Sequence, residues 1–150
     1  MPPARQPSAS STAPGLAQDL RAFSGKLRRR LRAQADAGDL TPSQTAALLR
    51  LESDGPATTS ALARAEGMRP QSMGAVVSAL AAGGLVTGTP DPADGRQTLL
   101  SLTDACREWL SLGRAARQDW LSRIIEDQLS PQEQAQLAAA MPLLRRLTRE

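Results

Sequence analysis

The sequence lacks histidine and tyrosine, and it holds one cysteine, one phenylalanine and two tryptophans. Without histidine, the Ser-His and Cys-His catalytic pairs and most zinc sites are excluded. A single cysteine forms no disulfide within its own chain, as is usual for proteins of a reducing compartment. We therefore expect no catalytic site, no metal and no cofactor, and hence no enzyme.

No apolar run approaches the roughly 18 residues of a membrane-spanning helix, and the N-terminus has no signal-peptide core. These absences predict a cytoplasmic protein without a membrane partner. The 150 residues are 41% hydrophobic and 22% charged, as in a globular domain with a real core. Because aromatic residues are only 2%, that core must consist of aliphatic residues and methionine, which favours helices.

The positive charge is almost wholly arginine, with Lys26 as the only lysine and a formal net charge of +3. Arginine binds a phosphate or a guanine edge through two parallel hydrogen bonds, so this bias permits a nucleic-acid partner. A GC-rich genome would produce the same bias. Composition alone therefore leaves the kind of partner open.

The N-terminal region changes character at Gly15. Residues 1–14 carry four prolines and no apolar period, which predicts a disordered tail. After Gly15, apolar residues recur every three or four positions on one helical face, as in helices that pack against another helix of the same chain or of a partner. This stripe consists of Leu16, Leu20, Phe23, Leu27 and Leu31.

Three helices follow in the middle of the chain. The capping box Thr41-Pro42-Ser43-Gln44 predicts a helix that ends near Ser53. Cap residues at 58–60 predict a short helix over 60–66, which Gly67 ends with a left-handed turn, and Pro70 suits the first turn of a helix over 69–82. The expected inward residues of the last two helices are Leu62, Ala63, Met73, Val76, Val77 and Leu80.

A hairpin and two helices complete the chain. The runs 85–87 and 98–102, joined by a Pro/Asp/Gly tip, predict two strands. Thr103 caps a long helix, and a second capping box, Ser130-Pro131-Gln132-Glu133, begins the last one. Pro142 predicts a kink in that last helix. Its expected apolar face consists of Leu137, Met141, Leu144 and Leu147.

Three compact helices followed at once by a hairpin is the order of a winged helix-turn-helix. The predicted fold class is therefore mainly α (α+β) with a two-strand wing. A B-DNA major groove about 12 Å wide accepts one helix, and the hairpin tip can then reach the adjacent minor groove.

Several motifs, found in order, resemble the MarR family of bacterial transcriptional regulators over about residues 16–148. The most specific are Gly84-Leu85-Val86 and the Asp94-Gly95-Arg96 of the wing. The others are Leu40-Thr41-Pro42-Ser43-Gln44, Leu62-Ala63, Arg69-Pro70-Gln71-Ser72-Met73, Leu80, Asp91-Pro92-Ala93 and Leu102-Thr103.

This resemblance implies an obligate homodimer whose terminal helices interlock while two winged lobes bind a pseudo-palindromic operator on double-stranded DNA. It also implies an effector, since many members release DNA on binding a small, often aromatic anion. The chain would then comprise a tail (1–14), a dimerisation region (15–40 and 104–150) and a DNA-binding region (41–103).

The outward face of the helix over 69–82 supplies the candidate DNA-binding residues, namely Arg69, Gln71, Ser72, Ala75 and Ser78. Glutamine can pair with adenine, serine can serve several bases, and arginine can hold a phosphate or a guanine. Alternatively, Gln71 and Ser72 only cover loose backbone donors of an ordinary first turn. The helix departs from the family at Gly74 and Ala75, where a polar residue and an arginine are frequent.

At the hairpin tip, Arg96 is expected to enter the narrow minor groove, with Asp94 orienting its guanidinium. The alternative is an exposed turn with a chance Asp/Arg pair. The strand before the wing, Thr87-Gly88-Thr89, lacks the basic residue that is usual in the family.

One property favours a different function. Residues 41–104 carry four arginines and six carboxylates, a net charge of −2, whereas a DNA-binding module should be basic. Binding would depend on where a few arginines lie, with help from the cluster at residues 28–32 unless that cluster is a solvated helix face. The second hypothesis is a protein-protein interaction module of winged-helix shape.

Three residues of the long helix leave alternatives open. Trp109 and Trp120 share one face and are candidates for a ligand pocket, or they pack in the core or a dimer interface. Cys106 is either a redox-sensing thiolate or a small buried residue. The leading hypothesis is a homodimeric, ligand-responsive DNA-binding regulator that acts as a repressor.

Overall fold

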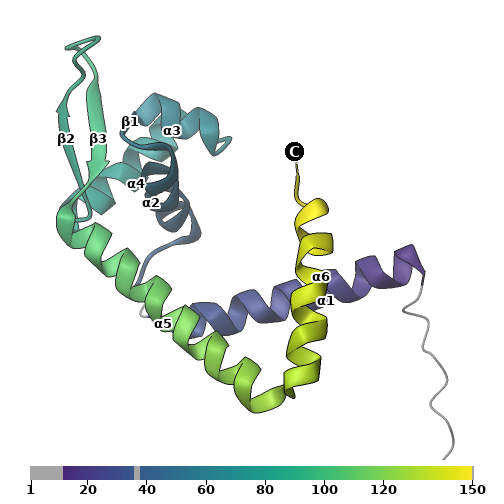
Figure 1. Cartoon of the computed structure of the whole chain (residues 1–150). Helices are drawn as coiled ribbons and strands as arrows, with labels where there is room; N and C mark the ends of the chain where they lie inside the picture. The colour runs from purple at the N-terminus through teal and green to yellow at the C-terminus, as the bar shows by residue number, and fades with distance from the viewer. Residues whose placement is uncertain (1–11, 36–37, 150) are drawn as a thin grey trace, which may run out of the picture. The chain divides into compact units, whose positions relative to one another are not determined.

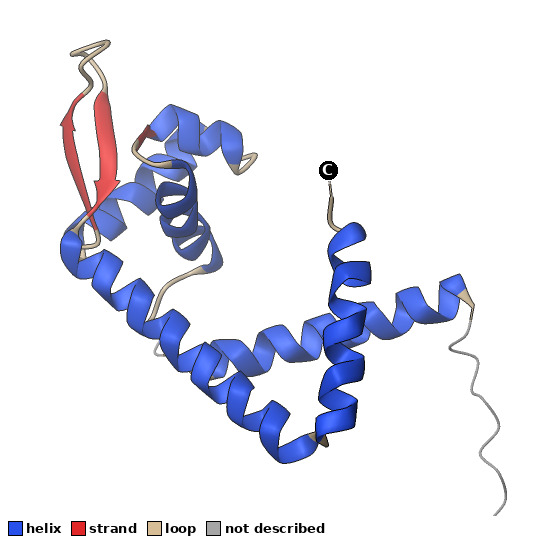
Figure 2. Cartoon of the chain, in the orientation of Figure 1, coloured by secondary structure: helices blue, strands red, loops and turns tan. Residues whose placement is uncertain are grey.

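The structure, a computed structural model, describes residues 12–35 and 38–149 (Figure 1). These residues form a mainly helical α+β fold with one small antiparallel sheet, which confirms the predicted fold class (Figure 2). Within them, no helix is long and apolar enough to cross a membrane. The elements are α1 (Ala13–Ala33), α2 (Pro42–Asp54), β1 (Ala57–Thr58), α3 (Thr59–Ala65), α4 (Pro70–Ala82), β2 (Val86–Pro90), β3 (Thr98–Leu102), α5 (Asp104–Gln128) and α6 (Pro131–Arg146).

The chain divides into two compact units. The winged-helix unit comprises residues 38–114, and the terminal unit comprises residues 12–35 and 115–149. The dimerisation region predicted from Asp104 onward stays a prediction. The winged-helix unit includes the first part of α5, up to Arg114. The reason is packing, because Cys106 of α5 is buried in the core of this unit and Trp109 packs against that core.

Both predicted capping boxes form. The Thr41 hydroxyl accepts the Gln44 N–H at 3.2 Å, and the Gln44 side chain accepts the Thr41 N–H at 2.9 Å. At the start of α6, the Ser130 hydroxyl accepts the Glu133 N–H at 3.3 Å, and Glu133 accepts the Ser130 N–H at 2.8 Å. Each box satisfies backbone donors that a helix start otherwise leaves unpaired.

The N-terminal end of the chain differs from the sequence expectation, whereas the last helix contains Pro142 as expected. α1 begins at Ala13, so Ala13 and Pro14 are helical rather than part of a tail. Proline suits a first helical turn, and Thr12 caps this one by accepting the Gly15 N–H at 3.3 Å. Residues 1–11 of the predicted tail lie outside the described residues. α6 continues as one helix past Pro142.

The sheet has the strand order β1-β3-β2 and is antiparallel throughout. β2 pairs with β3 from Val86 opposite Leu102 to Pro90 opposite Thr98, so it extends beyond the predicted run 85–87. β1 was not predicted from the sequence, because two residues show no period. β1 is recognisable as a strand only by its pairing with β3.

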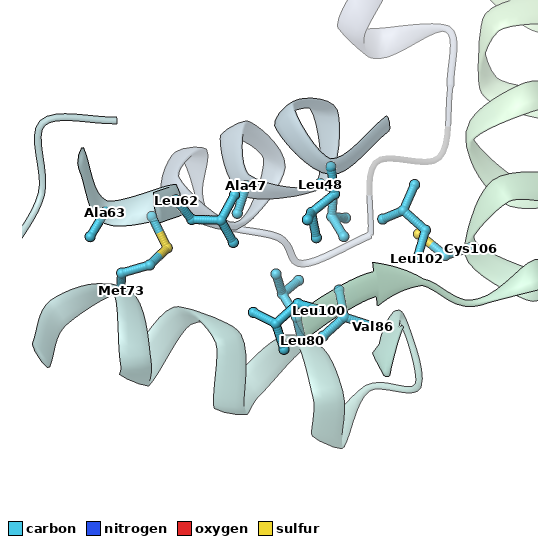
Figure 3. Packing of buried hydrophobic residues seen from close by; sticks show 11 residues of the cluster. Ala47, Leu48, Leu62, Ala63, Met73, Leu80, Val86, Leu100, Leu102 and Cys106 are labelled. Atoms are coloured by element: carbon cyan, nitrogen blue, oxygen red, sulfur yellow. The ribbon is translucent and has the colours of Figure 1, made fainter. Parts of the chain in front are cut away.

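An apolar core holds α4 in the winged-helix unit (Figure 3). The predicted inward residues are confirmed, since Leu62, Ala63, Met73 and Leu80 are at most 1% exposed and Val76 and Val77 pack against the core. Burying one Leu or Met side chain contributes roughly 1.5–3 kcal/mol. With its inner face fixed in this way, α4 turns its opposite face to solvent.

The terminal unit, in contrast, has no buried residue among those described. α1 and α6 bury none, and the single buried residue of α5, Cys106, belongs to the winged-helix unit. Large apolar side chains of this unit are 38% to 71% exposed. They are Leu16, Phe23, Leu137, Met141, Leu143 and Leu147. Helices with such faces bury them against a partner in stable proteins.

Candidate nucleic-acid interface

A helix-turn-helix is formed by α3, a tight turn and α4. The turn depends on Gly67, whose φ of 62° is the left-handed conformation that side chains disfavour. The Gly67 N–H donates to the Arg64 carbonyl at 3.3 Å, and the Met68 N–H donates to the Ala63 carbonyl at 2.8 Å. These bonds end α3 and set the direction in which α4 begins.

The outer face of α4 carries all five of its predicted DNA-binding residues. Arg69, Gln71, Ser72, Ala75 and Ser78 are exposed. Within residues 12–35 and 38–149, the side chains of Gln71 and Ser72 make no hydrogen bond, and no side chain caps the helix. The alternative in which Gln71 and Ser72 cover loose backbone donors therefore does not occur, and both side chains are available to a ligand.

The wing tip is ordered by its two carboxylates. Asp91 accepts the Ala93 N–H at 2.9 Å, and Asp94 accepts the Arg96 N–H at 3.1 Å. The Asp91 N–H also donates to the Gln97 carbonyl at 2.9 Å, closing the loop. The sequence suggested that Asp94 orients the Arg96 guanidinium. In the structure Asp94 instead holds the backbone of Arg96. The Arg96 side chain is exposed at the tip of the hairpin, which projects from the helices of the unit (Figure 1).

An ion-pair network ties α2 to the turn of the helix-turn-helix. Arg50 Nε donates to Glu66, the residue that ends α3, at 2.9 Å, and Arg50 Nη1 lies 3.3 Å from Asp54. These hydrogen bonds, first the one to Glu66, raise the pKa of Arg50 above its ordinary value. The sequence does not predict this network, because 16 positions separate Arg50 from Glu66 and no local signal links them.

The six arginines of the winged-helix unit fall into two groups. Three form ion pairs within the unit: Arg50 with Glu66 and Asp54, Arg107 with Asp104, and Arg114 with Glu52. The others, Arg64, Arg69 and Arg96, are exposed and have no ion-pair partner among the described residues. These three lie on the helix-turn-helix and the wing, so the free positive charge is concentrated there despite the acidic balance of the segment.

Cys106 is a core residue. It is fully buried, and its N–H donates to the Thr103 hydroxyl at 3.1 Å. Burial, and secondarily the charge of Glu52, raises the pKa of the Cys106 thiol, while Arg107 lowers it by a smaller amount. A reactive thiolate needs the opposite combination of exposure and a lowered pKa. Of the two alternatives for Cys106, the structure favours the small buried residue.

We expect Cys106 to resist alkylation by iodoacetamide at neutral pH while the protein is folded, and to react rapidly in denaturant. The raised pKa also implies that folding stability declines as pH rises above the thiol's unfolded value near 8.5, because only the unfolded state then loses the proton readily. Mass spectrometry of timed samples measures the labelling. Equal labelling rates with and without denaturant would show that the thiol is accessible in the native state.

The two tryptophans lie in different units and have different partners. Trp109 packs against the winged-helix core. Trp120, in the terminal unit, lies beneath the Arg30 guanidinium, 5.1 Å from the ring centroid, in a cation–π contact. This contact also engages one member of the basic cluster of α1.

A separate pocket of about 340 Å³ lies within the winged-helix unit. Neither tryptophan lines it. Its wall combines two arginines and a carboxylate with a hydroxyl and apolar groups. The lining residues are Leu51, Glu52, Gly55, Pro56, Ser101, Leu102, Arg107 and Arg114.

The helix-turn-helix of α3 and α4 and the hairpin of β2 and β3 together define a winged helix-turn-helix protein. The MarR family pattern matches residues 38–97. An HTH-type transcriptional regulator of Mycobacterium tuberculosis is 40% identical over 107 residues, which cover 71% of this chain and 75% of the relative. The chain therefore belongs to the MarR family.

Solved structures share the fold. A transcriptional regulator from Pseudomonas aeruginosa PA01 is 39% identical, with a TM-score of 0.79 over 90% of this chain and 94% of that chain. A Staphylococcus aureus MepR variant, solved with an oligodeoxyribonucleotide, shares the fold at 19% identity, with a TM-score of 0.69 over 89% of this chain and 98% of that chain. The protein is thus an HTH-type transcriptional regulator of the MarR family, as the sequence predicted.

Proposed function

We propose that this protein is a homodimeric repressor that binds a pseudo-palindromic operator and releases it when a small anionic effector binds. In this proposal α4 occupies the major groove, where Gln71 and Ser72 contact base edges, and Arg96 enters the adjacent minor groove. Repression is the simplest outcome, because a dimer bound at an operator excludes other proteins from that DNA.

The observation that carries the proposal is the set of exposed polar side chains on α4 and at the wing tip. Gln71, Ser72 and Ser78 are exposed on α4, Arg96 is exposed at the wing tip, and the side chains of all four have no partner among residues 12–35 and 38–149. Glutamine and serine suit base edges, and arginine suits the negative potential of a narrow minor groove. The MepR variant bound to an oligodeoxyribonucleotide lends support from a protein of the same fold.

Dimerisation is proposed from the terminal unit. Its helices have no core of their own, while Phe23 is 59% and Leu147 is 71% exposed. A second copy would cover these faces with the same apolar surface, as a two-fold interface requires. Two lobes held in this way match the inverted symmetry of a palindromic site.

The effector is proposed from the pocket of the winged-helix unit. Arg107 and Arg114 can bind a carboxylate, and Leu51 and Leu102 can contact an apolar body. An anion there would compete with Glu52 for Arg114. The sequence expectation that Trp109 and Trp120 line a ligand pocket stays a prediction, and neither residue lines this pocket.

The competing function, a winged-helix module that docks on protein, is favoured by the net charge of −2 over residues 41–104. Salt titration separates the two functions. Binding to a DNA duplex is expected to weaken steeply with ionic strength, since each neutralised phosphate contributes about −0.9 to the slope of log K against log [salt]. A protein that retained no DNA above background even at low salt would favour the docking module.

A further inference from the structure

We propose that Arg64, on the last turn of α3, binds a DNA phosphate and fixes the position of α4 in the groove. This inference rests on the proposed DNA binding and adds a residue that sequence analysis did not single out. Arg64 is exposed, and its guanidinium has no hydrogen bond or ion pair among the described residues.

The charge pattern of the winged-helix unit distinguishes Arg64 from the other arginines. Apart from Arg69 at the start of α4 and Arg96 at the wing tip, every other arginine of this unit forms an ion pair with a carboxylate of the same unit. The carboxylate nearest to Arg64 in sequence, Glu66, is held by Arg50 at 2.9 Å. Arg64 therefore has no ion-pair partner among the described residues, although a carboxylate lies two positions away in the sequence.

The location of Arg64 suits a phosphate. It lies on the first helix of the helix-turn-helix, three residues before Gly67, and Arg69 follows two residues after that turn. In helix-turn-helix proteins the first helix crosses the sugar-phosphate backbone while the second enters the groove. Arg64 and Arg69 thus flank, in the sequence, the turn at Gly67 that leads into α4.

A purely structural role is the competing explanation, because a cation in the last turn of a helix interacts favourably with the helix dipole. The salt dependence of DNA binding distinguishes the two roles. A phosphate contact contributes to the slope of log K against log [salt], whereas loss of folded protein lowers the apparent affinity by the same factor at every salt concentration.

The test measures fluorescence anisotropy of two labelled duplexes, one enriched by site selection and one with its sequence scrambled, at about 50 to 200 mM salt. Arg64→Ala is expected to lower the affinity for both duplexes by a similar factor. It should also reduce the magnitude of the slope by about 0.9 per bound copy, and so by about 1.8 for a dimer. Arg64→Lys should retain most of the slope, because it keeps the charge.

Arg123→Ala is the matched control, since it removes the same charge from the terminal unit, where Arg123 is exposed. Its slope should equal that of the wild type. If the wild type binds the enriched duplex and Arg64→Ala leaves the slope unchanged, the role of Arg64 is wrong while the proposed function stands. If the wild type binds neither duplex, the proposed function and the role of Arg64 are both wrong.

Discussion

Replacing Phe23 by aspartate is expected to convert the proposed dimer into monomers and to lower the affinity for the operator by about 10²–10⁴-fold. Phe23 is 59% exposed in the single chain, on a helix that buries none of its residues. A carboxylate placed in an apolar interface loses its water without gaining a partner. A monomer also binds with one lobe at a time, which removes the gain from joining two sites.

Gln18→Asp supplies the control for this variant, because it adds the same charge to an exposed polar position on another face of α1. Sedimentation equilibrium measures the mass in solution, and anisotropy measures the affinity. Circular dichroism shows whether the winged-helix unit, which has its own core, stays folded. A Phe23→Asp protein that kept the dimer mass would exclude this face of α1 from the interface.

Arg96→Ala is expected to weaken operator binding by roughly ten- to a hundredfold for each copy, the range of hydrogen bonds that involve a charged group. The Arg96 guanidinium is exposed and unpaired, so nothing within the described residues competes with DNA for it. A narrow minor groove concentrates negative potential at the depth that a wing-tip arginine reaches. A gel shift or an anisotropy titration measures the loss.

Two further variants locate the origin of that loss. Arg96→Lys keeps the charge but not the planar guanidinium, so its effect should be smaller. Asp94→Ala removes the acceptor of the Arg96 N–H and should loosen the tip, which gives an intermediate loss. If Arg96→Ala and the wild type bind the operator equally, the wing takes no part in recognition.

Local signals predicted most of the fold. Thr41 and Ser130 begin helices because their hydroxyls and the residues three positions later close capping boxes, and such signals are contained in four consecutive residues. Spacing of Met73 and Leu80 gave the inner face of α4 and thereby the exposed set around Gln71. The α4 part of the candidate site was therefore predictable, because the buried face of a helix determines which residues lie on its exposed face.

Pairings between distant residues could not be predicted. β1 exists because Ala57 lies opposite Leu100, and β2 continues through Gly88 and Pro90, poor strand formers, because β3 supplies its partners. The charge pattern likewise depends on pairings between residues that are distant in the sequence. Summing charges along residues 41–104 gave an acidic segment, whereas the structure shows that Arg50 is neutralised by its neighbours and Arg64 is not.

The most direct test of DNA binding by two winged-helix units of a homodimer is the selection of binding sites from random duplexes by the wild-type protein. A homodimer is expected to select an inverted repeat whose half-site centres lie about one helical turn apart, roughly 10 base pairs or 34 Å. Such symmetry requires two copies of α4 bound at once. A single asymmetric site would rule out binding by two symmetric copies, and a pool that shows no enrichment after repeated selection would rule out sequence-specific DNA binding.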